Sequence, residues 1–140
     1  MADNKEIVKR YYLDVLNQGR LEVLDDIAAA DHVENDPFPW QTQGIDGLRQ
    51  RVASIQAAFN PQFTLEDVIG EGDRVVVRWT NRGTHRGEFF GVPPSGKEVV
   101  VSGIDIHRLS DGRLAEHWDE VDLFGLMTQL GVIPAPNPPA

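Results

Sequence analysis

The chain has 140 residues, of which 41% are hydrophobic and 25% are charged, and its formal net charge is -9. This length and composition predict one globular domain with a packed core, and the negative charge argues against nucleic acid as a partner. The absence of cysteine excludes disulfides, thiolate zinc sites and cysteine nucleophiles. Because the N-terminal residues do not resemble a signal peptide and no apolar run reaches membrane-spanning length, we expect a soluble, cytoplasmic protein that does not enter a membrane.

The first part of the chain has the apolar spacing of helices. Over residues 4–17, apolar residues recur every three or four positions with charged residues between them, which predicts an amphipathic helix. A second, shorter helix is predicted over residues 21–28, after a glycine that ends the first. A third is predicted to begin at Ile45 or Gly47 and to end at Phe59.

The character of the sequence then changes from helical to strand-like. Residues 31–44 mix Asp, Asn, two prolines and Trp40, and are interpreted as a loop with room for a short strand. After residue 60 the chain is rich in Val, Ile, Thr and aromatic residues, which are typical of strands. The predicted strands, separated by turn sequences, span 63–69, 74–85, 97–109 and 113–121. A last helix is predicted over 123–130, with Asp122 as its N-cap.

Helices followed by long antiparallel strands are the order of an α+β domain, with the helices gathered on one face of a sheet. We predict a single domain over residues 1–133 and a Pro-rich C-terminal tail over 134–140. A strongly curved sheet that is covered by helices leaves a cavity. An apolar cavity with a few polar groups is the first place to look for chemistry.

The last predicted strand carries the strongest candidates for that chemistry. A period of two places His117 and Asp119 on one face, about 6 to 7 Å apart along the strand, and Trp118 on the other face. Burial in an apolar cavity would raise the pKa of Asp119, which suits it to accept a proton near neutral pH and to return it later. A solvated pair on an outward face is the alternative that strand patterning leaves open.

Other polar residues of the strands add weaker candidates. His85 ends the second predicted strand, and Asp105 and His107 share a face of the third, although a solvent-exposed polar face would give the same pattern. His32, in the loop after the second helix, is interpreted as structural or exposed. No compact ligand spacing such as His-Glu-x-x-His is present, so no metal site is predicted. The glycine-rich segment 83–96 lacks the dinucleotide and phosphate-loop patterns, so no nucleotide cofactor is predicted either.

An ordered set of motifs runs through the second half of the chain. It comprises Gly83-Thr84-His85-Arg86-Gly87, Gly91-Val92-Pro93-Pro94-Ser95-Gly96, Asp111-Gly112-Arg113-Leu114, Glu116-His117-Trp118-Asp119 and Gln129-Leu130-Gly131. Together these motifs resemble the SnoaL-like polyketide cyclases, from the first helix to about Pro134. The resemblance implies the nuclear transport factor 2-like fold, a curved antiparallel sheet wrapped into a cone with the N-terminal helices packed on its concave face.

The resemblance also implies a reaction and a set of site residues. In characterised cyclases of this family, an aspartate of the last strand transfers the proton in an intramolecular aldol ring closure, without metal or cofactor. That aspartate matches Asp119, and its neighbouring histidine matches His117. Among the candidate substrate contacts, His85 matches a family histidine, Asp105 stands where the family has another histidine, and the polar loop residue matches Asn35 or Glu34. Trp40 of the same loop is a further candidate contact.

The expected function is therefore a cofactor-free acid/base enzyme that acts on a hydrophobic small-molecule carbonyl compound. A non-catalytic binding or dimerisation module is the alternative from another class, and an isomerase, dehydratase or epoxide hydrolase is the alternative within enzymes. A homodimer is expected, with a homotetramer as the alternative. We predict that Trp118 lies in the dimer contact or the outer packing, away from the cavity.

Overall fold

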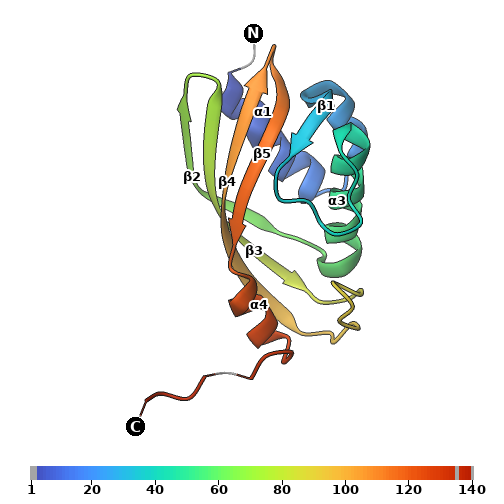
Figure 1. The fold of residues 1–140 in the computed structure, drawn as a ribbon, viewed down its shortest axis with the longest axis vertical. Helices are drawn as coiled ribbons and strands as arrows, with labels where there is room; N and C mark the ends of the chain where they lie inside the picture. The colour runs from blue at the N-terminus through green and yellow to red at the C-terminus, as the bar shows by residue number, and fades with distance from the viewer. Residues whose placement is uncertain (1–2, 135, 140) are drawn as a thin grey trace.

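The computed structural model describes residues 3–134 and 136–139 of the chain (Figure 1). The helices of this part are α1 (Asn4–Arg10), the π-helix η1 (Tyr11–Leu16), the 3-10 helix η2 (Leu21–Val23), α2 (Leu24–Ile27), α3 (Gly44–Phe59) and α4 (Leu123–Gln129). The strands are β1 (Ala28–Glu34), β2 (Phe63–Glu71), β3 (Arg74–Thr84), β4 (Glu98–Ser110) and β5 (Arg113–Val121). None of the described helices is long and apolar enough to cross a bilayer.

The described strands form one curved sheet in the order β1-β5-β4-β3-β2, with α1 and α3 beside it in Figure 1. The pairs from β2 to β5 are antiparallel. Alternate residues of β3 and β4, such as Val75, Val77, Val99 and Val101, are buried against the helices. The predicted α+β fold class is therefore confirmed. The single-domain prediction stays a prediction, and the predicted tail includes Ala135 and Ala140, which lie outside the described residues.

Strand β1 lies where the sequence predicts the end of the second helix and a loop with room for a short strand. Its sequence, Ala-Ala-Ala-Asp-His-Val-Glu, has Val33 as its single β-branched residue and no Phe, Tyr or Trp, so it carries little of the composition that marks strands. It nevertheless pairs with β5 in parallel, with Val33 opposite Glu116 and Glu34 opposite His117. This parallel edge places residue 34 beside residue 117, although 83 residues separate them along the chain.

The first predicted helix forms, but it widens in its second half. Asn17 donates its backbone N–H to the carbonyl of Tyr12, five residues back, at 2.9 Å. Such π-type turns are uncommon and often occur at functional sites. In this one, the neighbouring residues Tyr11 and Tyr12 are 4% and 0% exposed, so both rings enter the core.

Two predictions about the C-terminal part are confirmed. Trp118 lies on the outer face of β5, where the Arg74 guanidinium stacks 4.9 Å from the centre of its ring. Asp122 caps α4, because its Oδ1 accepts the backbone N–H of Gly125 at 2.9 Å.

Candidate active site

A cavity of about 480 Å³ lies between the helices and the inner face of the sheet. Aromatic side chains make up much of its wall: Phe38, Phe59, Phe63, Trp79, Phe89 and Phe90. Its polar end is formed by Tyr11, Arg51, Asp105, His117 and Asp119. This is an apolar site with polar groups gathered mainly at one end, as expected for binding a hydrophobic molecule with one reactive region.

Strand β5 presents Asp119 and His117 to the cavity, as the period of two predicted. The side chain of Asp119 is 10% exposed, and its Oδ2 accepts a hydrogen bond from Arg51 Nη2 at 2.5 Å. The backbone N–H of Asp119 donates to Asp36 Oδ2 at 2.9 Å, and this hydrogen bond connects β5 to the loop after β1. The carboxylate is thus held at the cavity wall by an arginine from α3.

Burial raises the pKa of Asp119 to about 6, in the direction that the sequence predicted. The positive charges of Arg51 and His117 act the other way, and the negative charges of Asp105 and Glu34 add to the effect of burial. Asp119 therefore changes its protonation state close to neutral pH, as a general base that later acts as an acid must do.

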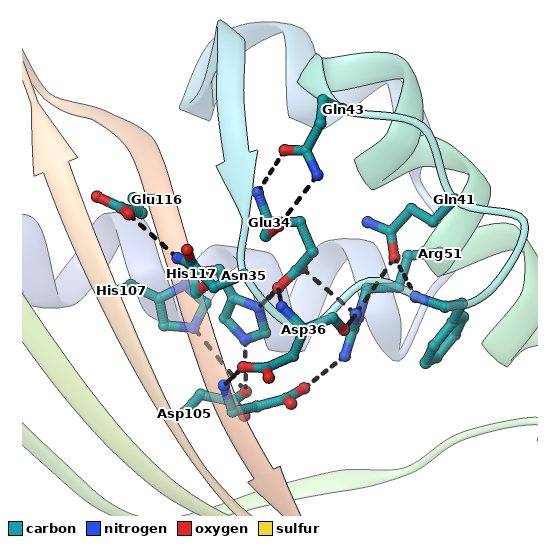
Figure 2. A network of polar contacts seen from close by, with 12 residues as sticks. Glu34, Asn35, Asp36, Gln41, Gln43, Arg51, Asp105, His107, Glu116 and His117 are labelled. Carbon is teal, nitrogen blue, oxygen red and sulfur yellow. Dashed lines mark hydrogen bonds and ion pairs between the residues drawn. The ribbon is translucent and has the colours of Figure 1, made fainter.

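A count of buried charges explains why Asp119 holds the labile proton. Two cations balance Glu34 and Asp105: His117 lies between them, and Arg51 pairs with Glu34 and Asp119 (Figure 2). Ionised Asp119 adds a third negative charge, whereas protonated Asp119 leaves the cluster neutral. Because an unbalanced charge is costly away from water, the carboxylate at the cavity wall is the one that takes up a proton.

His117 acts as a fixed cation in this arrangement. Its Nδ1 donates to Glu34 at 2.7 to 2.8 Å, and its Nε2 lies 3.6 Å from Asp105 Oδ2. Burial alone would lower the pKa of His117, but the close carboxylates of Asp105 and Glu34, the second of them hydrogen-bonded to it, outweigh burial and raise it to about 9. His117 is therefore an imidazolium at neutral pH and cannot serve as the base.

Asp105 connects this cluster to helix η1. The Tyr12 hydroxyl donates to Asp105 Oδ2 at 2.5 Å and lies 2.7 Å from His107 Nε2. Burial opposes ionisation of Asp105, but the His117 imidazolium 3.6 Å away and the hydrogen bond from Tyr12 outweigh burial and lower the pKa of Asp105 to about 2. Burial lowers the pKa of His107 to about 3, so this ring is neutral and donates Nε2–H to the Tyr12 oxygen.

Among the described residues, three side chains at this end of the cavity lie close enough together to hold a metal ion. Asp105, His107 and His117 bring one potential ligand atom each within 4.8 Å of one another. On His107, the hydrogen bond with Tyr12 already occupies Nε2, the nitrogen nearer to Asp105. On His117, Glu34 occupies Nδ1, and Nε2 faces Asp105 Oδ2 at 3.6 Å as an ion pair. Hydrogen bonds and ion pairs thus account for the contacts within this grouping.

Tyr11 offers a free donor at the polar end. It lines the cavity, and its hydroxyl has no hydrogen-bond partner among the described residues. Burial raises the pKa of Tyr11 well above its usual value, with Arg51 acting against this and Glu34 adding to it. The phenol therefore remains protonated and can donate to an oxygen of a bound molecule.

Three predicted contact residues lie outside the cavity lining. His85 is fully buried and pairs through Nδ1 with Ser95 Oγ at 3.0 Å. Asn35 extends β1 by bonding Glu116 and the backbone of residue 117. Trp40 is 47% exposed and packs on Phe38 and Phe90, two residues of the cavity wall. The structure thus brings Asp119, His117 and Asp105 together and leaves these three apart from them.

Sequence reasoning missed Arg51, although the sequence contains a signal for it. Arg51 lies on the apolar face of α3, three residues after Leu48 and four before Ile55. An arginine on a buried helical face needs paired carboxylates, and here they are Glu34 and Asp119. The sequence offers Glu34 only as an alternative to Asn35, and in the structure it is Glu34 that bonds His117.

Comparison with known proteins gives consistent results. Residues 6–130 match the sequence profile of the SnoaL-like polyketide cyclases. Nogalonic acid methyl ester cyclase of Streptomyces nogalater is 26% identical over 122 residues, 85% of this chain and 91% of that protein. Aklanonic acid methyl ester cyclase DnrD of Streptomyces peucetius is 27% identical over 148 residues, 99% of this chain and 97% of that protein. The structure of TsrD from Streptomyces laurentii has a TM-score of 0.84 at 33% identity, covering 95% of this chain and 100% of that one.

Proposed function

Because the chain belongs to the SnoaL-like polyketide cyclase family, we propose that it closes a ring in a hydrophobic carbonyl compound by an intramolecular aldol reaction. Asp119 is the general acid/base of this proposal, and the reaction uses the protein's own residues without a cofactor. The observation that carries the proposal is the placement of Asp119, with a pKa of about 6, at the polar end of an aromatic cavity. Two similar proteins are named as cyclases of polyketide methyl esters, which supports a substrate of the same class.

The first step is proton abstraction from a carbon next to a carbonyl group. The Asp119 carboxylate takes the proton, and the electrons of the C–H bond form an enolate. The negative charge thereby moves from Asp119 to the substrate oxygen, beside the Arg51 guanidinium and the Tyr11 hydroxyl. Because both groups are buried and already positioned, they stabilise this oxygen without a large reorganisation.

The second step closes the ring. The enolate carbon attacks a second carbonyl carbon of the same molecule, which forms the C–C bond and turns that carbonyl oxygen into an alkoxide. Protonated Asp119 then gives its proton to the alkoxide and returns to its starting state. The substrate is isomerised with no atom gained or lost, so a single carboxyl group suffices for both proton transfers.

The experiment uses nogalonic or aklanonic acid methyl ester as substrate, with binding and turnover measured separately. Asp119→Asn keeps the shape and removes the base, so turnover should fall at least about 100-fold while ligand binding stays nearly intact. His85→Asn, outside the cavity lining, is the control and should retain turnover if it folds normally. Turnover by Asp119→Asn at the wild-type rate would reject the mechanism.

One observation favours the non-catalytic alternative. The Asp119 carboxylate is already paired with Arg51 at 2.5 Å, as in a purely structural ion pair. A binding module would take up the same ligand and return it unchanged in both the wild type and Asp119→Asn. The assay above therefore separates an enzyme from a binding module.

We also propose a homodimer formed through the outer face of the sheet. Val100 and Ile104 of β4 are 51% and 48% exposed there, and Ile104 is two residues from Ile106, which pairs with the half-buried Trp118 of β5. Apolar side chains gathered on one face are typical of contacts between subunits. Sedimentation of the wild type and of Ile104→Glu tests this, since the charge should produce a monomer.

A further inference from the structure

The end of the cavity away from Asp119 contains a second polar feature. Asn81 of β3 lines the cavity and is 6% exposed. Its neighbours on the adjacent strands are Phe63 of β2 and Val101 of β4, and both also line the cavity. An amide thus stands in an otherwise apolar wall, where burial of a polar group is costly unless it is hydrogen-bonded.

Hydrogen bonding fixes the orientation of this amide. Asn81 Oδ1 accepts the backbone N–H of Gln62 at 2.9 Å, which distinguishes the oxygen from the nitrogen. Nδ2 has no partner among the described residues, and the small accessible surface of Asn81 faces the cavity. The amide therefore presents N–H donors to whatever fills that end.

Trp79, two residues earlier on the same face of β3, adds a second unpaired donor. Its Nε1 is buried and has no hydrogen-bond partner among the described residues. The indole lies over Gly103 of β4, where a side-chain Cβ would come within 2.3 Å of Trp79 Cζ2. Gly103 thus leaves space for the indole, and the indole N–H has no hydrogen-bond partner among the described residues.

The register of the sheet separates this feature from the acid/base residues. Asp119 pairs with Asp105, and Asp105 pairs with Val77 of β3, four residues before Asn81. Four residues correspond to about 13 Å along a strand. A molecule that reaches both ends of the cavity must therefore be elongated.

We propose that Asn81, with Trp79 beside it, forms a second binding subsite that accepts a neutral carbonyl or ester oxygen at the far end of an elongated substrate. This inference rests on the proposed function, because it deepens the choice of substrate. The subsite supplies donors without a cation, so a neutral acceptor fits it and a carboxylate does not. Asp119 then acts on one end of the substrate while Asn81 holds the other.

The test compares two fluorescent probes that cannot react, methyl anthracene-2-carboxylate and 2-propylanthracene, which differ in the ester oxygens. The wild type should bind the ester about 3- to 10-fold more tightly than the hydrocarbon, the range of one or two neutral hydrogen bonds. Asn81→Leu should abolish this preference. Because both probes are measured on the same variant, a general loss of structure lowers both affinities and leaves their ratio unchanged.

Two further variants keep the test decisive. Asn81→Asp keeps the shape of the side chain and the oxygen that accepts the Gln62 N–H. At pH 8 this variant should bind the ester less tightly than the hydrocarbon, because a carboxylate oxygen then faces the ester oxygen. Tyr11→Phe removes the donor at the other end and should leave the preference in place. An unchanged ratio in both Asn81 variants, or a ratio lost only in Tyr11→Phe, would overturn the subsite. Since neither probe has an acidic C–H next to a carbonyl, these results are independent of whether Asp119 catalyses a reaction.

Discussion

Strand β5 carries Asp119 and His117, whereas β1 and α3 supply Glu34 and Arg51, the groups that hold those two side chains. The β5 residues are two positions apart, and a local pattern places them on one face. Their partners come from elements 68 and 83 residues away in the chain. The comparison indicates that one strand provides the reactive carboxylate, while distant elements set its charge state and that of its neighbour.

The largest expected effect comes from breaking the contact between β1 and β5. Glu34→Gln removes a buried carboxylate that binds both His117 and Arg51, and it leaves both cations short of a partner. The free energy of unfolding should fall by about 3 to 5 kcal/mol, as is usual when one partner of a buried ion pair is lost. Urea denaturation measures this. Glu22→Gln, an exposed carboxylate paired with Arg20, is the control, and an equally small effect of both changes would contradict the buried network.

Removing the cation supplied by α3 should change catalysis in a defined way. Arg51→Met leaves Asp119 next to Glu34 and Asp105 without its nearest positive charge, so the pKa of Asp119 should rise further above 6. Turnover at pH 7 should fall at least about 10-fold, and the acidic limb of kcat/KM should move up by about one pH unit or more.

Arg49→Met is the matched control for that change. Arg49 lies on the exposed side of the same helix and pairs with Asp25 and Asp46, so its loss should leave the pH profile in place. An Arg51→Met profile that coincides with the wild-type one would show that α3 does not set the charge of Asp119.

Activity and the contribution of Asp119 to stability should respond to pH in opposite directions. The base form of Asp119 appears as pH rises through about 6, so kcat/KM should rise there and then level off. The raised pKa of Asp119 means that the folded state binds more protons than the unfolded state between about pH 4 and 6, so the contribution of Asp119 to stability is lost across that window. His117, with its pKa raised to about 9, contributes stability that is complete below about pH 6.5 and lost as pH rises through 9.

Unfolding curves at several pH values, compared with Asp119→Asn, check this behaviour. The buried neutral rings of His107 and His32, with pKa values lowered to about 3 and about 4, make stability rise with pH over the same acidic range. The contribution of Asp119 is therefore measured as the stability of the wild type minus that of the variant, which should fall between pH 4 and 6. Both proteins should lose stability between pH 6.5 and 9. A difference that stays constant from pH 4 to 6, or a stability that does not fall above pH 6.5, would contradict the corresponding shift.

The difference between the two regions also explains what the sequence could predict. The alternation in β5 correctly gives the facing of His117, Trp118 and Asp119, because a strand's period of two is a local property. Glu34 cannot be assigned in this way, since its role depends on a parallel pairing of β1, and the Ala-rich sequence of that strand does not reveal this pairing. The role of Arg51 could have been predicted, because its position on the apolar face of α3 is visible in the sequence and a buried arginine implies carboxylate partners.

The smallest expected effect concerns Asp122, where β5 gives way to α4. Its carboxylate accepts the Gly125 N–H, and a Cβ at position 125 would lie 2.2 Å from Asp122 Oδ2, so the cap requires the glycine as well as the acid. Asp122→Ala should lower the free energy of unfolding by about 0.5 to 2 kcal/mol, the usual range for a lost N-cap. Because Asp122 is exposed and makes no contact with Arg51 or His117, the acidic limb near pH 6 should stay where it is. A loss of turnover with unchanged melting temperature would instead give Asp122 the role proposed for Asp119, three residues earlier.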